Sequence, residues 1–247
     1  MQYLKAPVSE VVLGITFNKP IFTNDELFVI NSLLQEGYPN LELLPPLNLE
    51  KLEGYLLQTT FDIQITGQVL YRRRNKENTR LIQVQQNAIY YNWIRLDSVP
   101  VGDYPGYDVI YNEYIGILDM LEKHLNKHFD KNIAFFDLTY HDRFFWEDYL
   151  TTLSNVNTIM DISVPQIFNN CNNIFSKYTY PLPIKNNFCI LNLSTATSPI
   201  EMKQILHFES NIRGTGLPFN EWFEMAHKNQ NQIFETIFKE SLKSKWN

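Results

Sequence analysis

The side chains best suited to chemistry near neutral pH are five histidines. His227 lies in a segment with helical periodicity, with Glu224 one turn before it and Asn231 one turn after it. A carboxylate at that spacing can hold an imidazole in one tautomer, which makes His227 a weak candidate for a general base or a ligand. We favour the alternative that it is a hydrogen-bonded core residue, because such pairs are usually structural.

A second polar group occurs at the end of a predicted strand, where His141, Asp142 and Arg143 follow one another. An acid, a base and a guanidinium together suit anion binding or phosphoryl chemistry. Neighbouring residues of a strand point to opposite faces, so only His141 and Arg143 share one. His141 is therefore only a weak catalytic candidate. His207 and Glu209 share a face as well, which a cross-strand polar pair also explains.

His124 and His128 have the i,i+4 spacing that lets two imidazoles of one helix reach a single metal ion. The segment HLNKH lacks the glutamate of a metalloprotease motif, and Lys123 and Lys127 add positive charge beside any bound cation. We therefore expect these side chains to lie on a solvated helix face and to bind no metal.

Motifs for cofactors and nucleophiles are absent from the sequence. It contains no GxGxxG, GxxxxGK[ST] or GxSxG segment, and Gly214 and Gly216 are too few to hold a phosphate. Cys171 and Cys189, the two cysteines, have no CxxC spacing, so we expect two buried free thiols. The sequence predicts no cofactor and no metal, and favours a protein that is not an enzyme.

One dense basic cluster stands out in an acidic chain. Its members are Arg72, Arg73, Arg74, Lys76 and Arg80. With Tyr71, Tyr90 and Tyr91 nearby to stack on bases, residues 72–80 are a possible nucleic-acid site. We favour the alternative that they are charges at a hairpin tip that block edge-to-edge association of sheets.

The surplus of aromatic residues, 17 Phe, 14 Tyr and 4 Trp, has two readings. Most of them fall on predicted strands that face helices, which indicates core. Tyr91, Trp93 and Trp222 are the candidates for the lining of a ligand pocket or for a partner-binding surface.

Periodicity and turn residues divide the chain into strands and helices. Strands are predicted over residues 8–17, 56–72, 79–85, 88–96, 132–145, 175–180, 187–195 and 204–210. Helices are predicted over residues 25–35, 107–129, 146–153 and 219–246. We expect an α+β protein with a curved antiparallel sheet and two long helices packed on one side. The order of elements in residues 1–130 recurs in residues 131–247, so a structural duplication within one compact unit is possible.

Composition narrows the class of protein. The 247 residues carry a net charge of −6, with 14% aromatic and 19% charged residues, which excludes a disordered chain. The acidic balance argues against a general nucleic-acid binder. Residues 1–10 show no secretory signal, and no apolar run approaches the ~20 residues of a membrane span. We expect a cytoplasmic protein without membrane contact.

Several segments together resemble a known family. They are KAPVSEVVLGITF at residues 5–17, IQVQQNAIYYNWIR at 82–95, YPGYDVIY at 104–111 and a C-terminal helix that contains His227, Phe234 and Phe238. In order and spacing they resemble a sporadically distributed, uncharacterised family of bacterial proteins of similar length. The resemblance implies a mobile gene system, and hence a role in antiviral defence or conflict.

From these observations we predict a non-enzymatic component that binds a protein partner, which a neighbouring gene could encode. One alternative is a small-ligand or nucleotide sensor with an aromatic-lined pocket. The other is a hydrolase or nuclease that depends on His227 or His141.

Overall fold

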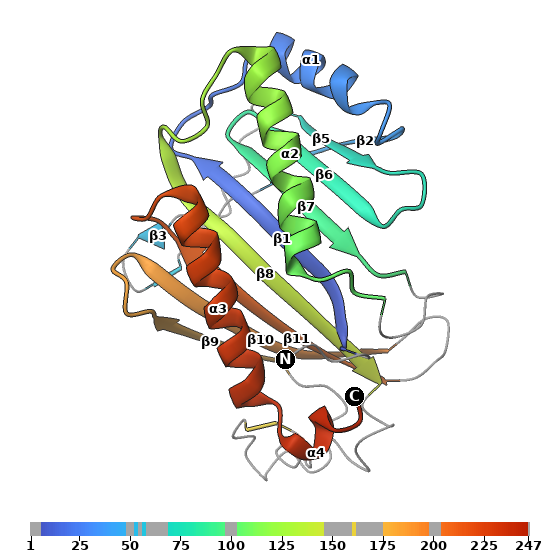
Figure 1. Ribbon diagram of the computed structural model, residues 1–247, viewed down its shortest axis with the longest axis vertical. Coiled ribbons are helices and arrows are strands. Elements are labelled where there is room, and N and C mark those ends of the chain that lie inside the picture. Colours follow the sequence, from blue (N-terminus) through green and yellow to red (C-terminus); the bar gives the residue numbers. More distant parts are fainter. Residues whose placement is uncertain are drawn as a thin grey trace.

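The computed structural model describes residues 6–47, 52–53, 56–57, 69–96, 103–145, 160–161, 175–197 and 204–246. Within these residues the chain forms one open antiparallel sheet of nine strands, with four helices (Figure 1). The predicted α+β class is therefore confirmed. The helix predicted over residues 146–153 and most of the strand predicted over 56–72 lie outside the described residues.

The strands of the large sheet follow the order β2-β5-β6-β7-β1-β8-β11-β10-β9. Their bounds are β1 (Val8–Phe17), β2 (Asn40–Leu44), β5 (Leu70–Arg74), β6 (Arg80–Gln85), β7 (Ala88–Ile94), β8 (Ile133–Phe145), β9 (Phe175–Pro181), β10 (Asn187–Thr197) and β11 (Gln204–Gly214). A separate short pair consists of β3 (Leu52–Glu53) and β4 (Leu56–Leu57).

The helices are α1 (Asn24–Leu34), α2 (Tyr107–Leu125), α3 (Phe219–Ile237) and α4 (Glu240–Lys243). Thr23 and Glu26 form a capping box that starts α1. The prediction of one helix over residues 219–246 is wrong, because Phe238 is extended and bridges to Met160. The buried ring of Phe238 packs edge-on against Phe208.

The two halves of the chain share one sheet. β1 and β8 are neighbours at its centre and pair antiparallel along most of their length, with Leu13 opposite Leu138. Strands of residues 1–130 lie on one side of this pair, and strands of residues 131–247 lie on the other. The elements α2 and α3 occupy corresponding places at the ends of the two halves.

Alternation along the strands decides which side chains meet the helices. Val11, Leu13 and Ile15 of β1 belong to the main core, and α2 and α3 lie across this face of the sheet (Figure 1). Trp222 and Phe223 of α3 are fully buried there, against each other and the ring of Phe136. None of the described helices combines the length and apolar character needed to cross a membrane.

The opposite face of the sheet carries a buried polar network. The Tyr90 hydroxyl lies 2.9 Å from both Thr16 Oγ1 and Asp137 Oδ2, and Asp137 also accepts a 2.6 Å bond from Arg213 Nε. Tyr90 can lie flat across β1 because residue 14 is glycine. A Cβ there would stand 2.1 Å from Tyr90 Cε1.

We predict that Gly14→Ala lowers the free energy of unfolding by about 1–3 kcal/mol, because the methyl group displaces Tyr90 from this network. Gly116→Ala is the matched control, since no atom lies within 4 Å of its added Cβ. In the middle of α2 it should stabilise the protein by roughly 0.5–1 kcal/mol. Urea unfolding of both variants checks the prediction, and a neutral Gly14→Ala change would contradict it.

Candidate functional site

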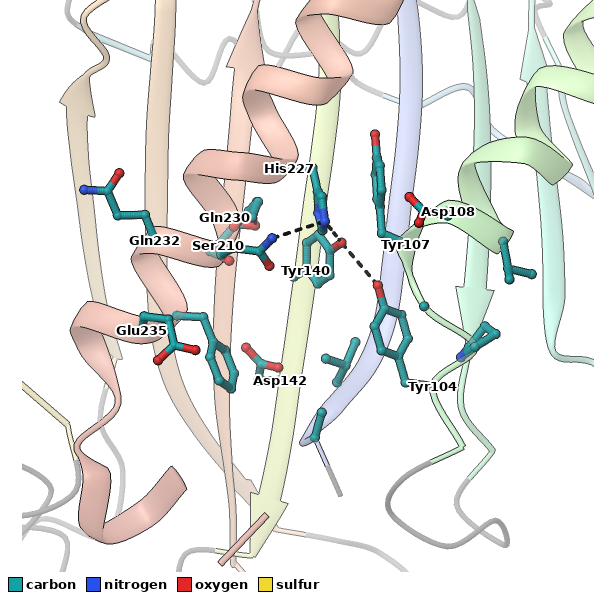
Figure 2. Close-up of a pocket in the computed structure, with 17 residues that line it drawn as sticks. Tyr104, Tyr107, Asp108, Tyr140, Asp142, Ser210, His227, Gln230, Gln232 and Glu235 are labelled. Atoms are coloured by element: carbon teal, nitrogen blue, oxygen red, sulfur yellow. Dashed lines mark hydrogen bonds between the residues drawn. The ribbon is translucent and has the colours of Figure 1, made fainter. Parts of the chain in front are cut away.

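A pocket of about 640 Å³ lies between the start of α2 and the middle of α3, over the central strands (Figure 2). Strands β1, β8 and β11 contribute to it together with both helices. Its polar and aromatic lining includes Tyr104, Tyr107, Asp108, Tyr140, Asp142, His227, Gln230, Phe234 and Glu235.

The turn before α2 places two of the aromatic walls. Gly106, the N-cap of α2, has φ +93°, a conformation that favours glycine. The chain can therefore reverse between Tyr104 and Tyr107, and both side chains line the pocket. The Tyr107 hydroxyl donates to the Phe223 carbonyl at 3.2 Å and so ties the start of α2 to α3.

Strand alternation separates the polar group at the end of β8. Tyr140 and Asp142 line the pocket. His141 and Arg143 lie on the other face, where His141 Nδ1 is 3.8 Å from Glu209 Oε2. The prediction that His141 and Arg143 share one face agrees with this geometry. Of the three residues of this polar group, only Asp142 lines the pocket.

His227 is held by three contacts. Its ring stacks on Tyr107 with centroids 3.9 Å apart, Nδ1 lies 3.1 Å from the Tyr140 hydroxyl, and Asn231 Nδ2 donates to Nε2 at 3.1 Å. Burial lowers the pKa of His227, although Asp108 opposes the shift. The ring is therefore neutral at pH 7. The hydrogen-bond partners of the ring are Tyr140 and Asn231, whereas the sequence indicated Glu224 as the group that holds the imidazole.

The contacts of His227 also fix its tautomer. Because an amide nitrogen only donates, Nε2 accepts from Asn231 and Nδ1 carries the proton that it donates to Tyr140. Tyr140 in turn lies 3.2 Å from the Tyr104 hydroxyl. Burial raises the pKa of Tyr104 to about 12, so this chain of hydroxyls stays protonated. The one lone pair of the neutral ring, on Nε2, accepts the hydrogen bond from Asn231.

Two residues that line the pocket each carry a buried acceptor without a hydrogen-bond partner, Asp142 Oδ1 and Gln230 Oε1. Asp142 is 2% exposed and Gln230 is 4% exposed. Gln230 Nε2 donates to the Leu138 and Ser210 carbonyls at 3.0 and 2.7 Å, so its amide cannot turn over without losing both bonds. Burial raises the pKa of Asp142 to about 7, although Arg95 acts to lower it.

The four arginines of the basic cluster contact other protein groups, and Lys76 is exposed at the hairpin tip. Arg73 is 4% exposed, and its guanidinium donates to Asn31 and to the Tyr38 carbonyl. Arg72 binds Gln83 and Glu42, and Arg74 lies 3.5 Å from Glu42. These bonds argue against a nucleic-acid site.

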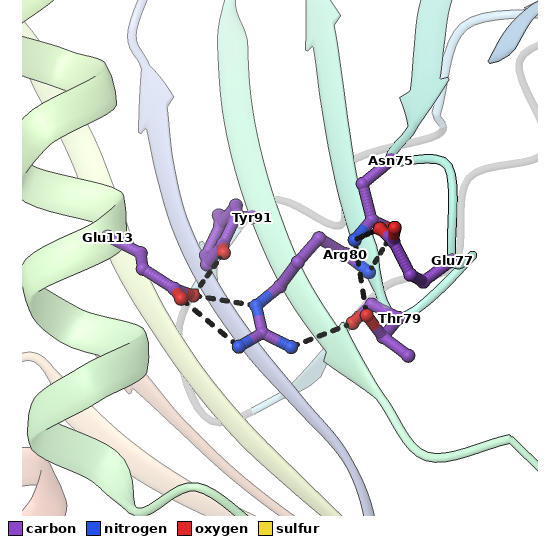
Figure 3. A network of polar contacts seen from close by, with 6 residues as sticks. All are labelled: Asn75, Glu77, Thr79, Arg80, Tyr91 and Glu113. Carbon is purple, nitrogen blue, oxygen red and sulfur yellow. Dashed lines mark hydrogen bonds and ion pairs between the residues drawn. The ribbon is translucent and has the colours of Figure 1, made fainter. Parts of the chain in front are cut away.

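Arg80 belongs to a polar network between β6 and α2 (Figure 3). Its Nε and Nη2 donate to the two carboxylate oxygens of Glu113 at 2.6 and 3.1 Å, and the Tyr91 hydroxyl donates to Glu113 at 2.5 Å. Burial acts to raise the pKa of Glu113, but the bonds from Arg80 and Tyr91 outweigh it and lower the pKa. This network fastens α2 to the sheet.

The prediction that the cluster protects a sheet edge is wrong in its location. β5 pairs with β2 on its outer side, so among the described strands β2, and not β5, lies at this edge of the sheet. The tip of the β5–β6 hairpin is instead held by Asn75, whose side chain accepts from the Arg80 backbone N–H at 2.9 Å.

Tyr91, Trp93 and Trp222 do not line the pocket. All three are buried in the main core, and the Trp222 indole donates to Asn187 Oδ1 at 2.7 Å. The three aromatic residues that we expected to line a cavity therefore fill the core with their own side chains.

His124 and His128 do not converge. His124 Nδ1 lies 2.8 Å from the Met120 carbonyl of its own helix, and α2 ends at Leu125, before His128. The left-handed conformation of Asn126 turns the chain away, so the helical i,i+4 spacing is lost. Among the described residues, no three His, Cys, Asp or Glu side chains are grouped to hold a metal ion.

His207 and Cys189 are also accounted for by their surroundings. Burial lowers the pKa of His207, and the nearby Arg143 and His141 lower it further. Cys189 is a buried free thiol whose pKa burial raises to about 11, which makes it a poor nucleophile. Cys171 lies outside the described residues.

Asp142 yields a prediction about pH. An acid whose pKa is about 7 when folded and near 3.8 when unfolded binds its proton more tightly in the folded state. Stability contributed by this group is therefore lost as pH rises from about 4 to about 7. Asp142→Asn removes this loss. The stability of the variant, measured relative to wild type, should therefore be higher at pH 8 than at pH 5 by on the order of 2 kcal/mol.

Urea unfolding at the two pH values measures this difference. Asp119→Asn, an exposed position on α2, is the control and should show none. An equal effect of Asp142→Asn at both pH values would mean that Asp142 is ionised in the folded protein throughout.

Sequence reasoning selected His227 but missed most of what surrounds it. Tyr104 was noted only as part of the YPGYDVIY segment, and Tyr140 and Gln230 belong to no motif. The one available signal for the pocket was the alternation that puts Tyr140 and Asp142 on the same face of β8. In comparisons with known proteins, the chain matches no protein-family model and no curated protein.

Proposed function

We propose that this protein is a non-enzymatic binding protein whose organic ligand occupies the pocket between α2 and α3. The observation that carries the proposal is the pair of buried acceptors, Asp142 Oδ1 and Gln230 Oε1, which have no partner within the protein. Leaving such groups unsatisfied costs about 1–3 kcal/mol each, a cost that a ligand donating hydrogen bonds removes.

The size and lining of the pocket support a small organic molecule. A volume of about 640 Å³ lies within the usual range for ligand sites. Tyr104, Tyr107 and Phe234 provide apolar surface, while His227 and Tyr140 provide fixed polar groups. Aromatic walls with a few converging polar groups are typical of sites that bind small organic molecules.

The state of His227 argues against the alternative of a hydrolase or nuclease. A general base needs a free lone pair within reach of its proton, and both ring nitrogens are engaged by Tyr140 and Asn231. Ser210 also lines the pocket. Its contact with α3 is made by its backbone carbonyl, which accepts from Gln230 Nε2, and not by its hydroxyl. We therefore propose a positioning role for His227.

Native mass spectrometry tests this function. The protein is incubated with a small-molecule extract of its host, and we expect one small molecule to be retained per chain. Val109→Trp, which fills the mouth of the pocket from α2, should abolish retention. Val29→Trp is the matched control, because Val29 and Val109 are similarly exposed, 43% and 44%, and Val29 lies on α1. Retention by Val109→Trp, or none by wild type, would contradict the proposal.

A second candidate function, binding a protein partner, is favoured by strand β9. Among the described strands it has a neighbour on one side only, so it forms an edge of the sheet. Phe175, Tyr178 and Tyr180 are exposed on it, Phe175 by 77%. An edge strand with exposed aromatic side chains is suited to pairing with an extended segment of another protein. Such a partner, encoded by a neighbouring gene, would fit the mobile-system role that the family resemblance implies.

This candidate predicts that products of neighbouring genes co-purify with the wild-type protein and that the double variant Phe175→Ser/Tyr178→Ser loses them. The melting temperature should change little, since both side chains are exposed. Phe28→Ser, at an exposed position of α1, should keep the complex. A complex that survives the double change would place the interface elsewhere.

A further inference from the structure

We propose that the ligand of the pocket carries a protonated nitrogen group, an alkylammonium or a guanidinium, whose N–H donors bind Asp142 Oδ1 and Gln230 Oε1. This inference rests on the proposed ligand-binding function and adds the chemical class of the ligand. The argument uses the unmet hydrogen bonds, the charge of the lining and the aromatic walls.

The hydrogen bonds that the pocket lacks are all of one kind. Both unpartnered atoms are acceptors, so the ligand must supply donors. Gln230 cannot offer its amide nitrogen instead, because Nε2 is already bound to the Leu138 and Ser210 carbonyls. An ammonium has three N–H donors and a guanidinium has five, whereas a carboxylate or phosphate has none when fully ionised.

The charge of the lining favours the same class. Asp108, Asp142 and Glu235 line the pocket, and no Lys or Arg does. Glu235 is offset by Lys243 of α4, which lies 2.8 Å away. The remaining carboxylates repel an anionic ligand and attract a cation, most strongly where Asp142 is shielded from water.

The walls suit the rest of such a ligand. Tyr104, Tyr107 and Phe234 line the pocket, and aromatic faces attract cations as well as alkyl chains. A quaternary ammonium would use these faces, but it has no N–H for Asp142 or Gln230. The pocket should therefore discriminate between two cations of similar size by their donors.

The charged groups around Asp142 predict how binding depends on pH. Arg95, which follows β7, acts to lower the pKa of Asp142, and Asp108 of α2 lines the same pocket as His227 and Glu235 of α3. Burial gives Asp142 a pKa of about 7, and a bound cation favours its ionised form. Burial lowers the pKa of His227, which favours its neutral form. Affinity for a cation should therefore rise between about pH 6 and pH 8.

The test uses probes of defined charge and similar size: butylguanidinium, butylammonium, butanol, butyrate and tetramethylammonium. Binding is followed by chemical shifts in two-dimensional NMR spectra of the full chain. We expect the two N–H cations to bind roughly tenfold or more tightly than butanol, with little binding of butyrate or tetramethylammonium. An acetylated, amidated arginine probe distinguishes a free ligand from a side chain that a partner presents.

Two variants connect the effect to the pocket. Asp142→Asn should weaken binding of butylguanidinium by roughly tenfold and remove its pH dependence. Asp119→Asn, exposed on α2, should change neither. Because the fold of Asp142→Asn can be followed in the same spectra, loss of binding is separable from loss of structure.

The outcomes separate this inference from the function beneath it. If butanol or butyrate binds as well as the cations, or if Asp142→Asn binds butylguanidinium normally, the cationic ligand is wrong. The binding function then still stands, provided that Val109→Trp loses the molecule retained from the host extract. If wild type retains nothing and binds no probe, both proposals are wrong.

Discussion

The antiparallel pairing of β1 with β8 is the interaction on which the rest of the structure depends. It joins the first strand of each half, so two sets of antiparallel strands become one sheet with a continuous core. Both strands are flanked on their other sides as well, β1 by β7 and β8 by β11. Neither can shift in register without turning the side chains of the core toward the opposite face. This constraint fixes where α2 and α3 lie, and so where the pocket between them opens.

Polar tethers then set the position of each helix more finely than apolar packing would. Beneath α2, Glu113 accepts hydrogen bonds from Arg80 and Tyr91. Beneath α3, Gln230 donates to backbone carbonyls of β8 and β11. Each tether consists of a side chain on a helix and groups on different strands. A directional polar contact of this kind has one favourable geometry, which leaves less freedom for the helix to slide than rings packed on rings.

Local pattern was enough to predict much of the fold. The bounds of β1 were predicted to the residue, and those of β8 nearly so, because β-branched and aromatic residues alternate between clear turns. The break at Phe238 was missed because it depends on a contact with Met160, which is distant in the sequence. For the site, His227 could be selected from its residue type alone. The role of Gln230 could not be predicted, because its hydrogen bonds depend on how α3 crosses β8 and β11. The pocket is a product of tertiary structure, and a single sequence holds no local sign of it.

The position of the pocket has a consequence of its own. Ala6, Val8 and Tyr107 come from the first half of the chain, and Tyr140, His227 and Gln230 come from the second. A molecule bound there is in contact with both halves at once, so it acts as a non-covalent crosslink across their junction. Its binding energy then adds to the cooperativity of unfolding and is not confined to one half. In such a protein, ligand binding would make the junction between the two halves more rigid without the movement of a lid.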